Sequence, residues 1–154
     1  MKGSLLLLLL LVLFSVAAGQ RDVSVRVLTN GLSWLENLCF DGEKFLYFSE
    51  ALNARVWRMD SSFNRTLYLD TGMKRILGVT FSQGSLFGCG VFANGSSVMY
   101  RSSGPGHFEV IAQLPKGQLG NGLDHHEATG FLYTAAEGSM VRKGRGGVYQ
   151  VNPK

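Results

Sequence analysis

The sequence predicts an all-β chain, a partial β-propeller of about three four-stranded blades. The first observation is a repeat. An apolar run, a polar turn containing glycine, and a leucine followed by an aromatic residue occur in three copies that end at Leu46-Tyr47, Leu86-Phe87 and Leu132-Tyr133. These leucines are 40 and 46 residues apart, which is typical of propeller blades. The second observation is composition: the 154 residues include 20 glycines, only 17% are charged, and nothing after the first 19 residues sustains helical periodicity.

The first 19 residues have the three parts of a secretory signal peptide. Lys2 supplies the positive start, residues 5–14 are an unbroken apolar run, and the small residues at 15–19 suit cleavage after Ala18 or Gly19. The apolar run is too short to span a bilayer as a helix. We therefore expect a secreted protein with no membrane segment after cleavage, and one propeller-like domain at 20–154.

Charge argues against nucleic acid as a partner. The formal net charge of +4 falls to +3 once Lys2 is removed, and the basic residues are scattered along the chain. The one local cluster, Arg142-Lys143-Gly144-Arg145, is typical of a solvated loop, with a basic binding patch as the alternative.

Secretion makes two further features interpretable. Asn64 and Asn94 each begin a glycosylation sequon, and Asn94 lies in an Asn-Gly turn. Cys39 and Cys89 are the only cysteines, and an oxidising compartment permits a disulfide between them. Both lie in apolar strand segments, however, so buried free thiols are the alternative, which we favour.

Alternation and turn signals predict the first blade. Residues 22–28 alternate polar and apolar side chains, which is typical of a half-buried strand. Residues 36–60 contain two or three strands, with turns at Asp41-Gly42 and Asn53-Ala54. Residues 66–70 are expected to form the outer strand of this blade.

The second and third blades follow the same scheme. The second blade spans about 77–114, and its last strand is expected at 108–112. The third blade begins near 120 and is still incomplete at Lys154. Because three blades do not close a ring, we expect either a truncated product, which we favour, or self-association through the open propeller edge.

Several motifs, in order and at blade spacing, resemble the family of gluconolactonase and senescence marker protein (regucalcin). They lie at 36–41, 121–124, 130–133 and 147–151, and the resemblance covers about residues 30–152. This family belongs to a wider six-bladed group with strictosidine synthase and paraoxonase. The resemblance therefore implies that the chain forms about half of a six-bladed ring.

The resemblance also implies a divalent cation site, most commonly for calcium. In the family, a glutamate of the first blade and the asparagine of an Asn-Gly-Leu-Asp element bind the ion, and these match Glu36 and Asn121. Calcium prefers hard oxygen donors of this kind, and it would polarise the carbonyl of a small-molecule lactone or ester substrate. The third ligand, a carboxylate that also activates water, comes in the family from a later blade and has no counterpart in this chain.

Structural alternatives exist for each candidate residue. Glu36 is equally compatible with a surface carboxylate at the start of a strand, and Asn121 with a plain Asn-Gly turn. Asp124 is expected to face away from Asn121 or to lie within the strand, so we assign it no role. The remaining candidates are expected to be structural: His107, His125 and His126 in exposed turns or loops, and Trp34 and Trp57 as packing aromatics.

Two functions follow from the sequence. The first is a secreted calcium-dependent lactone or ester hydrolase of the propeller type, truncated and inactive if the missing ligand is essential. The alternative is a non-catalytic secreted propeller module that binds a ligand on one face. No serine-hydrolase elbow, phosphate-binding loop or zinc motif is present to support another class.

Overall fold

A computed structural model of the protein describes residues 24–138 and 146–153. The chain divides into two compact units, 1–30 and 31–154. None of the described residues forms a helix with the length and apolar character needed to cross a bilayer. The predicted signal peptide at 1–19 and the basic cluster at 142–145 lie outside the described residues.

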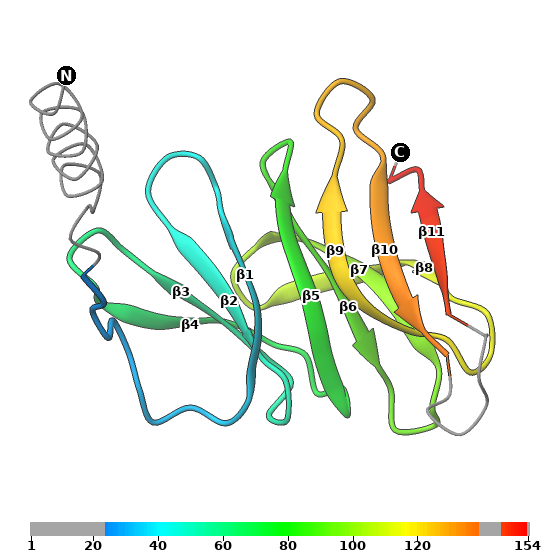
Figure 1. Ribbon diagram of the computed structural model, residues 1–154, viewed down its shortest axis with the longest axis horizontal. Helices are drawn as coiled ribbons and strands as arrows, with labels where there is room; N and C mark the ends of the chain where they lie inside the picture. Colours follow the sequence, from blue (N-terminus) through cyan, green and yellow to red (C-terminus); the bar gives the residue numbers. More distant parts are fainter. Residues whose placement is uncertain (1–23, 139–145, 154) are drawn as a thin grey trace, which may run out of the picture. The chain divides into compact units, whose positions relative to one another are not determined.

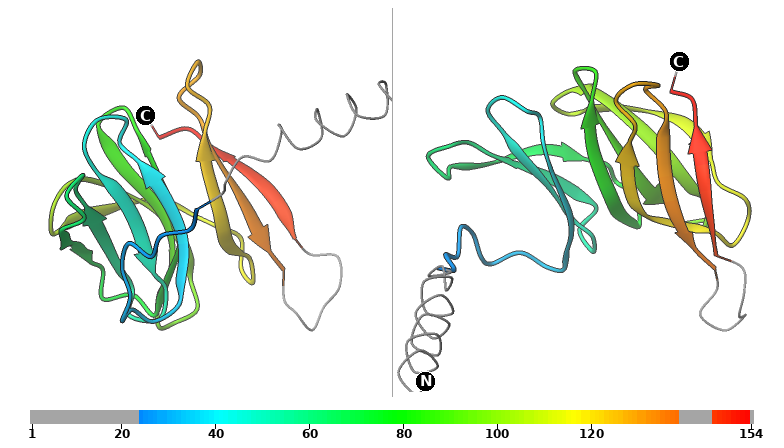
Figure 2. Two further views of the ribbon diagram at one scale, coloured as in Figure 1. Left: turned by 60° about the vertical axis from the view of Figure 1, so that its left-hand side comes forward. Right: turned by 45° about the horizontal axis from the view of Figure 1, so that its top comes forward.

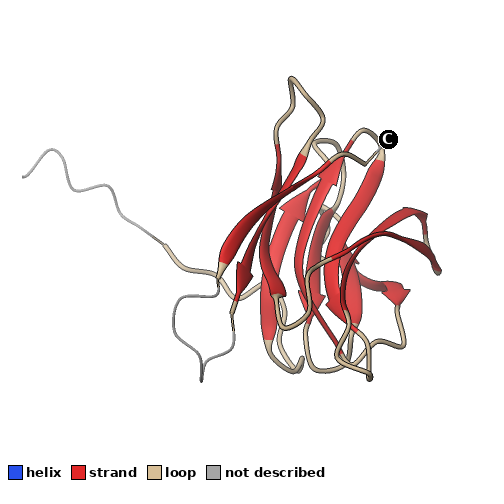
Figure 3. Cartoon of the chain, turned by 90° about the vertical axis from the view of Figure 1, so that its right-hand side faces the viewer, coloured by secondary structure: helices blue, strands red, loops and turns tan. Residues whose placement is uncertain are grey.

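The described residues of 31–153 form antiparallel sheets (Figure 3). The described strands are β1 (Leu35–Phe40), β2 (Leu46–Glu50), β3 (Arg55–Met59), β4 (Arg65–Asp70), β5 (Arg75–Ser82), β6 (Ser85–Val91), β7 (Ser97–Gly104), β8 (His107–Gln113), β9 (Leu119–His125), β10 (Leu132–Glu137) and β11 (Gly147–Val151).

These strands make three sheets in chain order, which confirms the prediction of an all-β partial propeller. The first sheet is β1-β2-β3-β4, the second is β5-β6-β7-β8, and the third, with three described strands, is β9-β10-β11. β5 contacts both β1 and β9, so the first strands of the three sheets lie side by side (Figures 1 and 2). We call β1, β5 and β9 the inner strands.

The expected strand at 22–28 is not present among the described residues. Residues 24–28 have no regular secondary structure, and Val25 and Val27 are 92% and 75% exposed. Alternating polar and apolar side chains are compatible with a strand. A strand also needs a neighbouring strand that pairs with its backbone N–H and C=O groups. The sequence pattern alone does not supply that partner.

Each inner strand has a β-bulge at the same place in its sheet. In β1 the bulge lies between Leu35 and Leu38, where three steps along β1 match two along β2. The pairing of β5 with β6 shifts in the same way between Ile76 and Val79. In β9, Asn121 is the extra residue. A bulge bends its strand and re-aims the neighbouring side chains, so the three inner strands are bent at matching positions.

The bulges are also where the first and second sheets are hydrogen-bonded together. The Ser49 hydroxyl accepts from the Asn37 N–H at 3.2 Å and donates to the Leu77 carbonyl at 2.7 Å. The Asn37 side-chain oxygen accepts from the Val79 N–H at 3.2 Å. These bonds satisfy backbone groups that the bulges leave outside the ladder.

Apolar side chains fill the space between the first and second sheets. Their cluster combines Tyr47 and Leu69 of the first sheet with Ile76, Val79 and Tyr100 of the second. Rings stack here as well, with Tyr47 and Phe81 5.4 Å apart between centroids. Sheet-on-sheet burial of this kind supplies most of the stabilisation of such a junction.

The second and third sheets meet in a second apolar cluster. Phe87, Cys89 and Met99 of the second sheet pack against Leu123 and Leu132 of the third. This junction is tighter at the inner strands, because a Cβ on Gly78 would overlap the Asn121 carbonyl oxygen and the Leu123 side chain. Glycine at 78 is therefore a condition for the two strands to approach this closely.

Cys39 and Cys89 are free thiols, so the disulfide alternative is wrong. Cys39 packs against the first cluster and Cys89 lies within the second, so the two thiols belong to different junctions. Burial, aided by the charge of Asp41, raises the pKa of Cys39 to about 12. Burial also raises the pKa of Cys89 to about 11, although a contact with the Thr134 hydroxyl opposes the shift. Both thiols are therefore protonated at neutral pH and poor nucleophiles.

Glu50 is a buried carboxylate that fixes the segment leading into β1. Its side-chain oxygens accept hydrogen bonds from the Ser33 N–H (2.9 Å), the Asn53 amide (2.7 Å) and the Trp57 indole N–H (2.9 Å). Desolvation would raise the pKa of Glu50, but these donors and the nearby Arg55 outweigh it and hold the pKa below its ordinary value of 4.5. The charged carboxylate thereby determines where the inner strand of the first sheet begins.

The close approach at Gly78 generates a stability prediction. Gly78→Ala should lower the free energy of unfolding by about 2–3 kcal/mol, because the added methyl overlaps the Asn121 backbone and must displace β9. Gly104→Ala is the matched control, since a Cβ there meets no atom within 4 Å. Urea denaturation followed by tryptophan fluorescence measures both. Equal stability of the two variants would contradict the packing described here.

Candidate functional site

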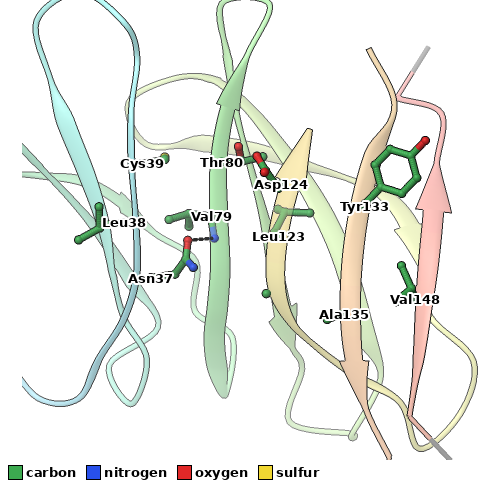
Figure 4. Close-up of a pocket in the computed structure, with 11 residues that line it drawn as sticks. Asn37, Leu38, Cys39, Val79, Thr80, Leu123, Asp124, Tyr133, Ala135 and Val148 are labelled. Atoms are coloured by element: carbon green, nitrogen blue, oxygen red, sulfur yellow. Dashed lines mark hydrogen bonds between the residues drawn. The ribbon is translucent and has the colours of Figure 1, made fainter. Parts of the chain in front are cut away.

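A cavity of about 580 Å³ lies along the inner strands, within the range typical of small-molecule sites (Figure 4). Side chains and backbone from β1, β5, β9, β10 and β11 form its wall. The lining residues are Asn37, Leu38, Cys39, Val79, Thr80, Gly122, Leu123, Asp124, Tyr133, Ala135 and Val148. The cavity begins directly after the three bulges, so the bulges determine which residues line it.

The wall of the cavity is mixed in character. Leu38, Ala135 and Val148 give it apolar surface, and Asp124 and Tyr133 add a carboxylate and a phenol. Ala135 pairs with Val148 across β10 and β11, so these two residues form one row of the wall. Such a wall suits a small amphipathic ligand, with apolar contact area and few polar anchors.

Two polar groups on the third sheet are arranged as neighbours. Tyr133 on β10 pairs with Asp124 on β9, which puts both side chains on one face of the sheet. The Gln150 amide donates to the Tyr133 hydroxyl at 2.8 Å, so the phenolic O–H can itself donate to a ligand. One oxygen of Asp124 accepts from the His125 N–H at 2.8 Å. The site thus offers a donor and an acceptor side by side.

Thr80 and His125 connect the second and third sheets at the same level. The Thr80 hydroxyl lies 3.1 Å from Nδ1 of His125, within hydrogen-bonding distance. Thr80 is buried, and His125 is the last residue of β9. Nδ1 of His125 is also 3.6 Å from a carboxylate oxygen of Asp124. This contact holds the end of β9, and with it Asp124, against β5.

Glu36 and Asn121, the two predicted metal ligands, both lie at bulges of inner strands. Both are half-buried. The Asn121 amide nitrogen donates to Glu137 at 2.7 Å, which leaves its side-chain oxygen available. Neither residue lines the cavity, although the backbone neighbours Asn37 and Gly122 do. The structure therefore puts the predicted ligands beside the cavity rather than in its wall.

The described residues supply only part of a metal site. Within 24–138 and 146–153, no group of three or more histidine, cysteine, aspartate or glutamate side chains could hold an ion. Calcium takes six to eight oxygen ligands. Glu36 and Asn121 would contribute one carboxylate and one amide oxygen, so the calcium site stays a prediction that needs further donors.

Three structural expectations from the sequence are wrong. His125 lies in β9 and contacts Thr80, whereas only His126 belongs to the following exposed turn. Trp34 is 60% exposed rather than a core residue. His107 is exposed, as expected, but it begins β8. Each error concerns a residue at the end of a strand or directly before one, where the local pattern does not fix the boundary of the strand or which side chains are covered.

Sequence reasoning missed Asp124 and Tyr133 as site residues. The signal was present, because the alternation of Gly122, Leu123 and Asp124 puts a buried leucine between two residues of the opposite face. What the sequence did not contain is the pairing of Asp124 with Tyr133, which depends on the register of β9 against β10.

Comparisons with known proteins support the propeller fold and no single family. No family model matches the chain, and no curated protein matches it. Among solved structures, the chain is similar to the PQQ-bound form of aldose sugar dehydrogenase from Streptomyces coelicolor, with a TM-score of 0.62, 17% identity, and coverage of 74% of this chain and 41% of that one.

Two other solved structures give the same result. A chain of the nidogen/laminin complex matches with a TM-score of 0.66 and 18% identity, over 80% of this chain and 46% of that one. A luciferin-regenerating enzyme matches with a TM-score of 0.59 and 13% identity, over 82% and 47%. These are β-propeller proteins, and this chain spans less than half the length of each. At such identities the likeness shows the fold alone. The specific resemblance to the gluconolactonase and regucalcin family stays a prediction.

The contact between β5 and β9 yields a prediction about the site. Thr80→Val should lower the free energy of unfolding by about 1 kcal/mol, because it removes the buried hydroxyl that lies within hydrogen-bonding distance of Nδ1 of His125. The control is Thr129→Val, which removes the hydroxyl 3.0 Å from Nδ1 of His126 in an exposed turn and should have a smaller effect. NMR chemical shifts of the two histidine rings measure the local change. An unchanged His125 ring in Thr80→Val would contradict this contact.

Proposed function

We propose that this chain is a secreted β-propeller module that binds a small lactone or ester in the cavity along its inner strands. The observation that carries the proposal is the 580 Å³ cavity, which combines apolar walls with a paired carboxylate and phenol. Asp124 and Tyr133 supply complementary chemistry: one accepts hydrogen bonds and the other donates them. Neither requires a metal ion for binding.

The chemical class of the ligand follows from these groups. The Tyr133 hydroxyl oxygen already accepts a hydrogen bond from the Gln150 amide, so its O–H would donate to the carbonyl oxygen of a lactone or ester. The Asp124 carboxylate would accept from a ligand hydroxyl, and Leu38, Ala135 and Val148 would cover the carbon skeleton. A hydroxylated lactone uses all three features, so it should bind more tightly than a plain one.

The second candidate function is calcium-dependent hydrolysis of the same class of ligand. The position of Glu36 and Asn121 at matching bulges of β1 and β9 favours it. Among the described residues, the Glu36 carboxylate has no hydrogen-bond or ion-pair partner, and the Asn121 side-chain oxygen is available. These oxygens would contribute to an ion site and, with a bound ion, carbonyl polarisation would become possible. The missing donors make this candidate secondary.

Secretion would also permit glycans at both sequons. Asn64 and Asn94 are exposed. Asn94 lies in a turn where its side-chain oxygen accepts from the Ser96 N–H at 2.9 Å. Asn64 is held more firmly, because its amide nitrogen donates to Asp60 at 3.2 Å. Neither residue lines the cavity, so glycans there are compatible with ligand binding.

Ligand binding is tested with δ-gluconolactone and δ-valerolactone by isothermal titration calorimetry. Ala135→Phe should weaken binding of both by at least about tenfold, because the ring fills the cavity. Asp124→Asn should weaken only the hydroxylated lactone. Val110→Phe is the matched control, since Val110 is an exposed β8 residue outside the cavity. The proposal fails if neither lactone binds, or if Ala135→Phe and Val110→Phe behave alike.

The hydrolase candidate predicts a calcium response in addition to binding. Calcium at about 1 mM should raise the Tm and support turnover of δ-valerolactone, because an ion that binds only the folded state stabilises it. Glu36→Gln should remove both effects, whereas Glu43→Gln, in the exposed β1–β2 turn, should retain them. Differential scanning fluorimetry and a pH-stat assay measure these responses. Binding without a calcium response would eliminate the hydrolase candidate and leave the binding module.

A further inference from the structure

The wall of the cavity contains a thiol, that of Cys39, and an aliphatic hydroxyl, that of Thr80. Either group could attack the carbonyl carbon of a bound ester if a neighbouring base removed its proton. The surroundings of Cys39 oppose this, because burial and the charge of Asp41 raise the pKa of its thiol to about 12. Thr80, in contrast, lies beside a histidine.

Thr80 and His125 have the arrangement of a nucleophile and its general base. Oγ1 of Thr80 lies 3.1 Å from Nδ1 of His125, within the range of about 2.6–3.2 Å that such pairs show. A neutral histidine with its ring proton on Nε2 has Nδ1 free to accept, so the Thr80 O–H can donate to it. Transfer of the proton along this contact would make the Thr80 oxygen strongly nucleophilic.

Asp124 supplies a third group, which orients the base and stabilises its charged form. Its Oδ1 lies 3.6 Å from Nδ1 of His125 and accepts from the backbone N–H of the same residue at 2.8 Å. The carboxylate would therefore stabilise the imidazolium that forms when His125 takes up the proton. Figure 4 shows Thr80 and Asp124 at the same level of the cavity. The other carboxylate oxygen can still accept from a ligand hydroxyl.

Packing between the second and third sheets fixes the relative position of the two groups. Thr80 pairs with Phe87 of β6, so its side chain lies on the face of the second sheet that packs against the third. Thr80 is only 4% exposed, and a β-branched side chain has few χ1 rotamers. His125 is held through its pairing with Leu132 of β10. The nucleophile and the base are therefore positioned before any ligand binds.

We propose that Thr80 is the nucleophile of a metal-independent ester and lactone hydrolase in which His125 is the general base. The inference rests on the proposed function, because the ester must enter the cavity described above. Oγ1 of Thr80 bonds to the carbonyl carbon while its proton moves to Nδ1 of His125. The bond between that carbon and the leaving alcohol oxygen then breaks, and this oxygen takes the proton from His125. The product is an acyl group esterified to Thr80.

Water completes the reaction. A water molecule gives a proton to Nδ1 of His125 and bonds to the acyl carbon. The bond between this carbon and Oγ1 of Thr80 breaks, and Oγ1 recovers the proton from His125. The carboxylic acid leaves, and both side chains are again in their initial state. With a lactone, the alcohol and the acid belong to one molecule, so the product is a hydroxy acid.

The chain contains a matched pair of side chains outside the cavity. Oγ1 of Thr129 lies 3.0 Å from Nδ1 of His126 in an exposed turn. The two pairs consist of the same atoms at nearly the same distance, but neither Thr129 nor His126 lines the cavity. If reactivity depends on an ester held in the cavity, Thr80 should react and Thr129 should not.

Hydrolysis of 4-nitrophenyl butyrate by the full chain, with EDTA present, tests the proposal. Release of 4-nitrophenolate should be at least about 100-fold slower in His125→Gln and should fall to the uncatalysed rate in Thr80→Val. Thr80→Ser should retain the reaction, because serine supplies the same oxygen atom. Thr129→Val and His126→Gln should react like the unmodified chain. Circular dichroism checks that each variant is folded.

A fluorophosphonate ester identifies the nucleophile directly. Its phosphorus should bond to Oγ1 of Thr80 with release of fluoride, and peptide mass spectrometry locates the adduct. An adduct on Cys39 or Thr129, turnover that survives in Thr80→Val, turnover that EDTA abolishes, or no turnover at all would each overturn the proposal.

Calorimetry with δ-gluconolactone separates this inference from the proposed function. The lactone should bind to His125→Gln with a Kd within about threefold of that of the unmodified chain, because the histidine does not line the cavity. Binding of the lactone without turnover by the unmodified chain would overturn this inference alone. Absence of both binding and turnover would overturn the proposed function as well.

Discussion

The close approach of the three inner strands is the constraint on which the rest of the structure depends. Gly78 can face the Asn121 carbonyl only because it has no side chain, and the bulges bend β1, β5 and β9 at matching positions. Bulges leave backbone groups outside the ladder, and Ser49 and Asn37 satisfy some of them across the first junction. Sheets of four strands can then fan out from a narrow centre while their apolar faces remain in contact.

The same constraint makes the cavity. A bulge re-aims the residues that follow it, and in each inner strand these residues, such as Leu38, Thr80 and Asp124, form the cavity wall. The hydrogen-bonding distance between Thr80 and His125 keeps the wall in register across two sheets. The same inner-strand positions therefore determine both the packing of the sheets and the shape of the cavity wall, and a change at a bulge would affect both. Glu36 and Asn121 lie at the bulges of β1 and β9, beside the cavity wall rather than in it.

The two ends of the sheet series are under a different constraint. Inside the series, every sheet face meets another face, and apolar side chains are buried on both sides. Leu38 and Phe40 of the first sheet and Val148 of the third sheet are exposed, although Phe48, which pairs with Leu38, is buried. Exposed apolar faces and open edges promote association, and proteins commonly cover them.

The sequence by itself determined the strands and their grouping. Turn residues and apolar runs are local signals, so the repeat located the three blade-length segments that contain the described strands, and it placed Glu36 and Asn121 near the start of the first and third segments. Only the tertiary structure decided which edges and faces meet. The register of β9 against β10 joined Asp124 to Tyr133, and the two junctions separated Cys39 from Cys89. Residues 24–28 have no regular secondary structure despite their alternation. The physical reason is that residues distant in the chain supply the hydrogen-bond partners and the covering faces. A local sequence pattern indicates only which secondary structure its own residues favour.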